Sequence, residues 1–179
     1  QSLAFIALID PRMSSVNPET RLRMVTALAL ASGPAGMVGG QSIDMGSARL
    51  KMNKQALEHM HRHKTGALIE AAVHLGALSS GRADAPQLAA LQTYSRSIGL
   101  AFQVQDDILD VESDTATLGK QQGADIARGK QTYPAVLSLE TSKKYALELR
   151  NQALDSLRYF DASAEPLRDL ARYIVERRH

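Results

Sequence analysis

The chain has 179 residues, of which 44% are hydrophobic and 22% are charged, and a formal net charge of +2 at pH 7. This composition is typical of a packed globular protein of about one domain. The sequence contains no cysteine and no tryptophan, which excludes disulfides, thiolate metal sites and thiol catalysis. Aromatic residues make up 4%, so neither base stacking nor charge favours nucleic-acid binding.

No window approaches the apolar length of a transmembrane helix, and the first residues lack the basic region of a signal peptide. We therefore expect no transmembrane segment and residence in the cytoplasm. The chain begins with Gln1 rather than Met, and residues 3–9 read as the end of a helix already under way. This start predicts that the chain is the later part of a longer protein.

The dominant pattern along the chain is helical, and we expect an all-α bundle of long antiparallel helices. Start and stop signals predict helices at about 17–32, 54–78, 86–112, 132–139, 141–159 and 165–177. Glycines between positions 33 and 40 interrupt an apolar stretch that ends near position 45. Positions 114–130 contain three glycines and no apolar period, which predicts a loop.

The helix predicted at 86–112 carries a narrow polar stripe. Asp106 and Asp110 lie one turn apart on one face, and Asp107 lies at the edge of that face. The stripe continues toward the N-terminus through three small or polar residues, Ser95, Gly99 and Gln103. No lysine or arginine occurs between positions 98 and 111, and the rest of the helix surface is apolar.

Three carboxylates within five residues repel one another on a helix that is otherwise apolar. A hard divalent cation would match their charge, and Mg²⁺ is usually held by one or two carboxylates with substrate phosphates. A solvated acidic helix end is the alternative, but such a face normally mixes charges. We therefore expect a metal site at Asp106, Asp107 and Asp110, with an open channel above it at Ser95 and Gly99.

Basic and amide groups could complement these acids. Lys64 lies on or beside the apolar face of its helix, so it either pairs with an anion or extends to solvent. The pattern alone favours solvent. Thr65 follows it and offers a hydroxyl. Gln41 and Asp44, one turn apart, fit a polar site or a buried network equally well.

Three histidines alternate in the same helix: His59, His61 and His63. Only the first and the last share a helical face, and no third ligand lies nearby in the sequence. This pattern favours surface histidines over a zinc site. In the loop at 114–130, Lys120 and Lys130 lie among glycines, where backbone N–H groups and ammonium groups would form a lid that binds anions.

Four segments, in this order, resemble the motifs of trans-prenyl diphosphate synthases, and especially of bacterial farnesyl diphosphate synthases. Residues 39–44 (GGQSID) resemble the Gly-Gln-x-x-Asp segment, and residues 63–68 (HKTGAL) resemble the Lys-Thr motif. Residues 102–110 (FQVQDDILD) resemble the second aspartate-rich motif, and residues 117–130 resemble the loop after it. The resemblance extends over essentially the whole chain.

The resemblance implies an all-α isoprenoid synthase fold around a central cavity, usually in a homodimer. It implies a prenyltransferase that condenses isopentenyl diphosphate with dimethylallyl or geranyl diphosphate to give farnesyl diphosphate. The cofactor would be Mg²⁺, with Mn²⁺ as an alternative, bound by Asp106, Asp107 and Asp110. The implied catalytic residues are Lys64, Thr65, Gln103 and Asp106. The implied substrate-binding residues are Lys64, Thr65, Gln103, Lys120, Lys130, Phe102, Gln41, Arg177 and Arg178, supported by Asp44 and Asp125.

The first aspartate-rich motif of the family has no counterpart in these 179 residues. We therefore expect residues 1–179 to be a single all-α domain, the C-terminal part of a larger prenyl synthase domain, that is inactive alone. The sequence leaves three alternatives: a non-catalytic diphosphate-binding or regulatory subunit, a terpene cyclase of the same fold, and a helical scaffold with a solvated acidic turn.

Overall fold

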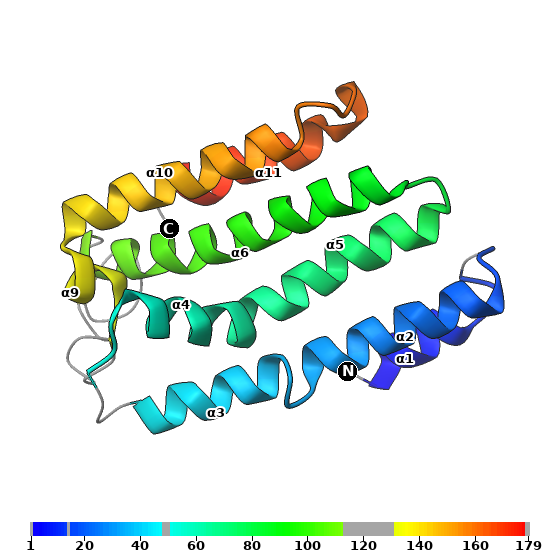
Figure 1. Cartoon of the computed structure of the whole chain (residues 1–179), viewed down its shortest axis with the longest axis horizontal. Coiled ribbons are helices and arrows are strands. Elements are labelled where there is room, and N and C mark those ends of the chain that lie inside the picture. Colours follow the sequence, from blue (N-terminus) through cyan, green and yellow to red (C-terminus); the bar gives the residue numbers. More distant parts are fainter. Residues whose placement is uncertain (1, 14, 48–50, 113–130, 178–179) are drawn as a thin grey trace.

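The structure, a computed structural model, describes residues 2–13, 15–47, 51–112 and 131–177. These residues form helices and turns without a strand, so the predicted all-α class is confirmed (Figure 1). The α-helices are α1 Ser2–Ile9, α2 Pro18–Ser32, α3 Met37–Ser47, α4 Lys54–His61, α5 Ala67–Ser80, α6 Ala85–Glu112, α9 Tyr133–Leu137, α10 Leu139–Ser156 and α11 Glu165–Glu176.

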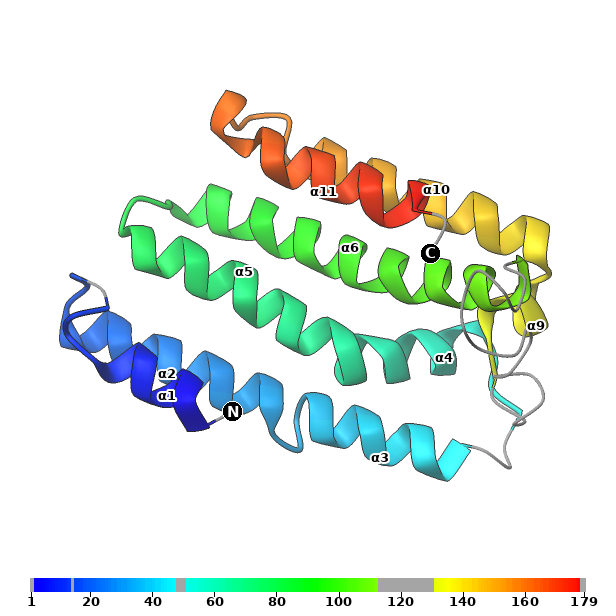
Figure 2. The same cartoon turned by 180° about the vertical axis from the view of Figure 1, so that it is seen from behind.

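The long helices lie side by side, with α6 near the centre (Figures 1 and 2). On one side of α6 lie α4 and α5, followed by α2 and α3, with α1 beside α2. On the other side lie α10 and α11. The core forms around α6, where the side chains of Tyr94 and Val104 are fully buried together with Leu57 of α4 and Leu157 beyond α10. Burial of these side chains against α6 from both sides holds the helices in place.

Local capping explains where several helices begin. The side chain of Asn17 accepts a 2.8 Å hydrogen bond from the Thr20 backbone N–H, and Pro18 occupies the first helical position. The side chain of Asn53 accepts a 2.9 Å hydrogen bond from the Ala56 backbone N–H in the same way. Both groups satisfy backbone donors that a helix start leaves unpaired, so these predicted starts are confirmed.

The helix predicted at 54–78 is interrupted by one π-helical turn, Arg62–Gly66, between α4 and α5. Other backbones pack closely against this turn. A Cβ atom on Gly40 of α3 would lie 2.1 Å from the Lys64 backbone nitrogen, and one on Gly99 of α6 would lie 3.3 Å from the Gly66 Cα. A π-turn inside an α-helix is rare and often marks a functional site.

The segment Pro18–Ser47 contains an 18-residue window of mean hydropathy 1.2, so the expectation that no window is long and apolar enough for a membrane span was wrong by that measure. Core helices of folded proteins and signal sequences also reach this hydropathy. The structure divides the segment into α2, of 15 residues, and α3, of 11 residues. Each is shorter than the roughly 20 residues that cross a bilayer. Only 17% of the window is buried, and the apolar side chains of Leu22, Leu30 and Val38 are exposed.

Candidate active site

Lys64 and Asp44 form an ion pair between the π-turn and α3. The Lys64 Nζ atom donates a 2.5 Å hydrogen bond to Asp44 Oδ2, and the side chains are 31% and 20% exposed. Lys64 therefore pairs with an anion, although the sequence pattern alone favoured extension to solvent. Gln41 lies half-buried on α3, one turn before Asp44, and Thr65 lies half-buried beside Lys64.

The three aspartates at the end of α6 have different surroundings. The Asp106 side chain is 53% exposed and accepts a 2.7 Å hydrogen bond from the Arg177 guanidinium. Asp107 Oδ2 accepts a 2.8 Å hydrogen bond from the Tyr133 backbone N–H at the start of α9. Asp110 is half-buried. Across the part of the chain that the structure describes, no three His, Asp or Glu side chains are grouped closely enough to hold a metal ion by themselves.

Arg177 connects the end of α11 to α6. Its guanidinium carbon lies 4.5 Å from the centre of the Phe102 ring, and its side chain is only 13% exposed. The Gln105 amide donates a 3.2 Å hydrogen bond to the Arg177 backbone carbonyl. Arg177 thus provides a partly desolvated positive charge against the acidic end of α6.

His61 is buried, with 8% of its surface exposed, so the prediction of surface histidines is wrong at this position. It is correct for His59, which is exposed. The His61 ring stacks on the Tyr133 ring at a centroid distance of 5.6 Å and an interplanar angle of 24°. Burial lowers the pKa of His61 to about 4, while Gln103, Asp44 and Asp106 act to raise it and Lys64 to lower it. The imidazole is therefore neutral at pH 7.

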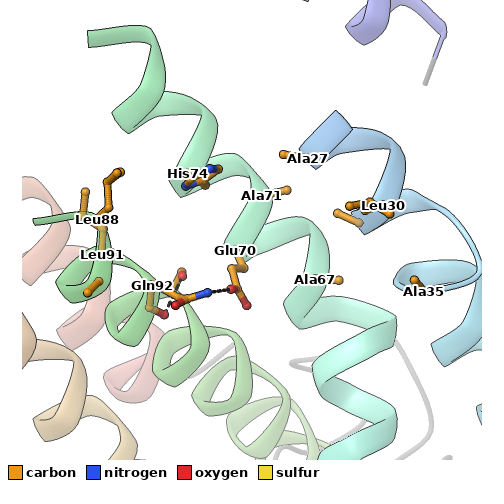
Figure 3. Close-up of a pocket in the computed structure, with 13 residues that line it drawn as sticks. Ala27, Leu30, Ala35, Ala67, Glu70, Ala71, His74, Leu88, Leu91 and Gln92 are labelled. Atoms are coloured by element: carbon orange, nitrogen blue, oxygen red, sulfur yellow. Dashed lines mark hydrogen bonds between the residues drawn. The ribbon is translucent and has the colours of Figure 1, made fainter. Parts of the chain in front are cut away.

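A cavity of about 530 Å³ lies between α2, α5 and α6 (Figure 3). Its lining is mostly alanine and leucine, including Ala71 of α5 and Leu30 of α2, with a polar patch where Gln92 donates a 2.6 Å hydrogen bond to Glu70. Ser95 lines this cavity, about three turns before Asp106, whereas the sequence predicted a channel above the aspartates at Ser95 and Gly99. Gly99 does not line it, because α6 packs closely against the π-turn there.

The structure joins Lys64 of the π-turn to Asp44 of α3, and Arg177 to Phe102 and Asp106 near the end of α6. On these elements also lie Gln41, Thr65 and Gln103. Four predicted residues, Lys120, Asp125, Lys130 and Arg178, lie outside the described residues. Sequence reasoning missed His61 and Tyr133. The only sequence signal for their proximity was that His61 precedes the Lys-Thr segment and Tyr133 begins a short helix after the loop.

Comparisons with known proteins show the family of the chain. Residues 7–161 match the polyprenyl synthetase family. The chain is 53% identical to farnesyl diphosphate synthase of Escherichia coli over 182 residues, which is 99% of this chain and 60% of that protein. The chain thus spans about three fifths of the length of this curated relative.

Solved structures of prenyl diphosphate synthases also resemble the chain over part of their length. An FPP/GFPP synthase from Zymomonas mobilis is 36% identical with a TM-score of 0.84, over 97% of this chain and 57% of that one. A geranyltransferase from Helicobacter pylori, complexed with magnesium and isoprenyl diphosphate, is 28% identical with a TM-score of 0.79, over 97% of this chain and 56% of that one. The isoprenoid synthase fold and the resemblance inferred from the motifs are therefore confirmed, and the chain belongs to the polyprenyl synthetase family.

Proposed function

We propose that this chain forms the part of a farnesyl diphosphate synthase that holds the allylic diphosphate at the end of α6. One observation carries the proposal. Lys64 of the Lys-Thr segment pairs at 2.5 Å with Asp44 of the Gly-Gln-x-x-Asp segment. The helix that ends in the aspartate-rich motif, α6, packs closely against the π-turn that carries Lys64. An ammonium group and carboxylates from three separate motifs therefore lie on adjoining elements, as recognition of a metal-bound diphosphate requires.

A divalent cation fits the donor set at the end of α6. Asp106 offers exposed carboxylate oxygens, the ligands that Mg²⁺ prefers, and its pairing with Arg177 shows that this carboxylate attracts a positive charge. In the proposal Asp106, Asp107 and Asp110 hold Mg²⁺, with Mn²⁺ as an alternative. The cation, when bound, neutralises the negative charge that develops on the departing diphosphate.

The remaining site residues act on the diphosphate and on the allyl group bonded to it. Lys64 exchanges its contact with Asp44 for the diphosphate and stabilises the leaving group. The Thr65 hydroxyl and the Gln103 carbonyl oxygen face the positive charge on the allyl group. Arg177, together with Lys120, Lys130 and Arg178, adds positive charge for diphosphate binding.

The proposed reaction needs no oxidant or reductant. The allylic C–O bond breaks, and the diphosphate leaves with the electron pair. The double bond of isopentenyl diphosphate attacks the allylic carbon and forms the new C–C bond. The resulting cation loses a proton to the diphosphate and becomes the longer allylic product.

The cavity between α2, α5 and α6 suits the hydrocarbon tail of the substrate. It begins on α6 about three turns before Asp106, roughly 16 Å along the helix axis, at the position of Ser95. Its lining, mostly alanine and leucine, offers an apolar surface for a hydrocarbon chain. A tail extending along α6 from a diphosphate near Asp106 would therefore reach it.

The proposal also covers the domain organisation, the cellular location and the assembly state of the protein. Residues 1–179 form one all-α unit of a larger prenyl synthase domain, in the cytoplasm and in a homodimer. The exposed apolar side chains of Leu3, Ile6 and Leu22 on α1 and α2 support a surface there that a second subunit covers. Light scattering of the purified protein measures its assembly state.

The activity test compares the chain alone with a fusion that adds the part of E. coli farnesyl diphosphate synthase preceding its matched region. Both receive Mg²⁺, geranyl diphosphate and isopentenyl diphosphate. We expect farnesyl product from the fusion and none from the chain alone. Asp106→Asn should abolish turnover in the fusion, whereas Glu112→Gln, in the same helix, should not. Diphosphate binding without turnover in the fusion would indicate a regulatory subunit instead.

A further inference from the structure

His59 and His63 lie one turn apart where α4 meets the π-turn. His59 belongs to α4 and is exposed, whereas His63 belongs to the π-turn and is half-buried. The centres of the two imidazole rings are 4.3 Å apart, and the ring planes form an angle of 49°. The rings are therefore neighbours on one side of the helix, close enough for a single bound atom to reach both.

A hydrogen bond to the backbone fixes the tautomer of His63. Its Nδ1 atom lies 2.7 Å from the backbone carbonyl oxygen of His59. A carbonyl oxygen only accepts hydrogen bonds, so Nδ1 carries the hydrogen and donates it. In the neutral ring, Nε2 then holds the lone pair. Histidines that bind metals usually donate their other ring N–H to a carbonyl or carboxylate group in this way, so His63 is already arranged as a ligand.

Two neighbouring imidazoles select a particular class of cation. Imidazole nitrogen suits Zn²⁺, Cu²⁺ and Ni²⁺, whereas Mg²⁺ binds oxygen ligands. A zinc–nitrogen bond is about 2.0–2.1 Å long, which two rings with centres 4.3 Å apart can supply to one ion. Because His59 is exposed, water can occupy the remaining coordination positions.

His61 does not complete a set of three ligands. Its ring is buried and stacks on Tyr133, because residues two positions apart in a helix do not share a face. The alternating histidines thus provide two ligands on the surface and one aromatic ring in the core.

The charged groups beside His63 have partners of opposite charge. The Arg62 guanidinium lies 3.9 Å from the Glu58 carboxylate, and Lys64 pairs with Asp44. These carboxylates weaken the repulsion that a divalent cation would meet from the two basic residues.

We propose that His59 and His63 form a surface site for Zn²⁺ or a cation of the same class, in which two imidazole nitrogens and water bind the metal. The site is separate from the proposed Mg²⁺ site and independent of the proposed reaction. A bound ion would connect the last turn of α4 to the π-turn that carries Lys64. Because the metal binds the folded arrangement of the two rings, it should also stabilise the folded chain.

Calorimetric titration of the chain with Zn²⁺ at pH 7, with Mg²⁺ in excess, tests the site. We expect His59→Gln and His63→Gln each to weaken Zn²⁺ binding at least about tenfold, since even the loss of a group that supports a metal ligand costs about 10- to 100-fold. His74→Gln, which replaces a histidine of α5, and Asp106→Asn, at the end of α6, should bind Zn²⁺ as wild type does. Equal Zn²⁺ affinity of His59→Gln and wild type would overturn the proposal.

The ring-nitrogen resonances of labelled histidine show which residues bind. We expect Zn²⁺ to shift the resonances of His59 and of the His63 Nε2 atom, while Nδ1 of His63 keeps its hydrogen. The resonances of His61 and His74 should stay unchanged. A response from only one of the two surface rings would refute a shared site.

Thermal unfolding separates metal binding from effects on the fold. Zn²⁺ should raise the unfolding midpoint of wild type and leave that of His59→Gln unchanged. Without Zn²⁺ the two midpoints should agree, because His59 is exposed. His59→Gln therefore keeps the test decisive even if His63→Gln disturbs the π-turn, and an equal Zn²⁺-induced rise in both proteins would contradict the site.

Discussion

Arg177 and Asp106 are 71 positions apart, yet the guanidinium of Arg177 donates a 2.7 Å hydrogen bond to the carboxylate of Asp106. The Phe102 ring lies under the same guanidinium. In the absence of a divalent cation, the end of α11 thus supplies the counter-ion for the most exposed acid of the candidate metal site. A cation that binds Asp106 must displace or share this arginine.

Replacing Arg177 tests that competition. We expect Arg177→Gln to bind Mn²⁺ up to about fivefold more tightly than wild type, because a partly exposed ion pair contributes up to about 1 kcal/mol. Calorimetric titration without diphosphate measures the change. Arg150→Gln, which removes an arginine paired with Glu176, is the matched control and should bind Mn²⁺ as wild type does. Weaker binding by Arg177→Gln would show that Arg177 supports the metal site.

Lys64 should contribute to diphosphate binding. We expect Lys64→Gln to weaken the binding of Mg²⁺-pyrophosphate about tenfold, since a hydrogen bond to a charged group contributes about 1.5–3 kcal/mol. Lys54→Gln serves as the control, because Lys54 lies in the preceding helix and pairs with Glu58. Calorimetry measures the affinity. If the Lys64 variant and wild type bind Mg²⁺-pyrophosphate equally well, Lys64 does not contribute to diphosphate binding.

Replacing each of two glycines in α3 by alanine should change the free energy of unfolding in opposite directions. A Cβ on Gly40 would overlap the Lys64 backbone, whereas one on Gly46 would meet no atom within 4 Å. We expect Gly40→Ala to lower the free energy of unfolding by about 1–3 kcal/mol. Gly46→Ala should raise it by up to about 1 kcal/mol, because alanine favours the helix. Urea unfolding measures both, and equal stability of the two variants would contradict the close approach of α3 to the π-turn.

Burial of His61 should make the fold sensitive to mild acid. The unfolded chain binds a proton at this ring near the ordinary pKa of 6.5, whereas the folded chain does so only near 4. Between these values the unfolded state holds more protons, so stability falls as pH is lowered from about 6.5 to 4. We expect this group to account for about 3 kcal/mol over that interval.

The comparison that isolates this effect is His61→Phe against wild type. The variant should lose less stability than wild type when the pH is lowered from 7 to 4, as measured by urea unfolding at each pH. His59→Phe, which replaces an exposed ring, should follow the wild-type curve. Parallel pH curves for wild type and His61→Phe would show that the ring titrates normally in the folded chain.

Periodic patterns in the sequence determined the helical class, and local groups determined where helices begin. The stripe through Gln103, Asp106 and Asp110 was visible because residues three or four apart share a face of one helix. Asn17 and Asn53 identified helix starts because their side chains bond to N–H groups three positions ahead. Each of these inferences depends on neighbours within a few residues.

The tertiary structure alone decided which distant groups meet. The sequence placed His61 among surface histidines, whereas packing of the π-turn between α3 and α6 buries its ring against Tyr133. Lys64 pairs with Asp44 and Asp106 with Arg177 because backbones far apart in the chain approach closely. Such pairings depend on how helices pack, and helical periodicity within one segment contains no information about the partner that covers it.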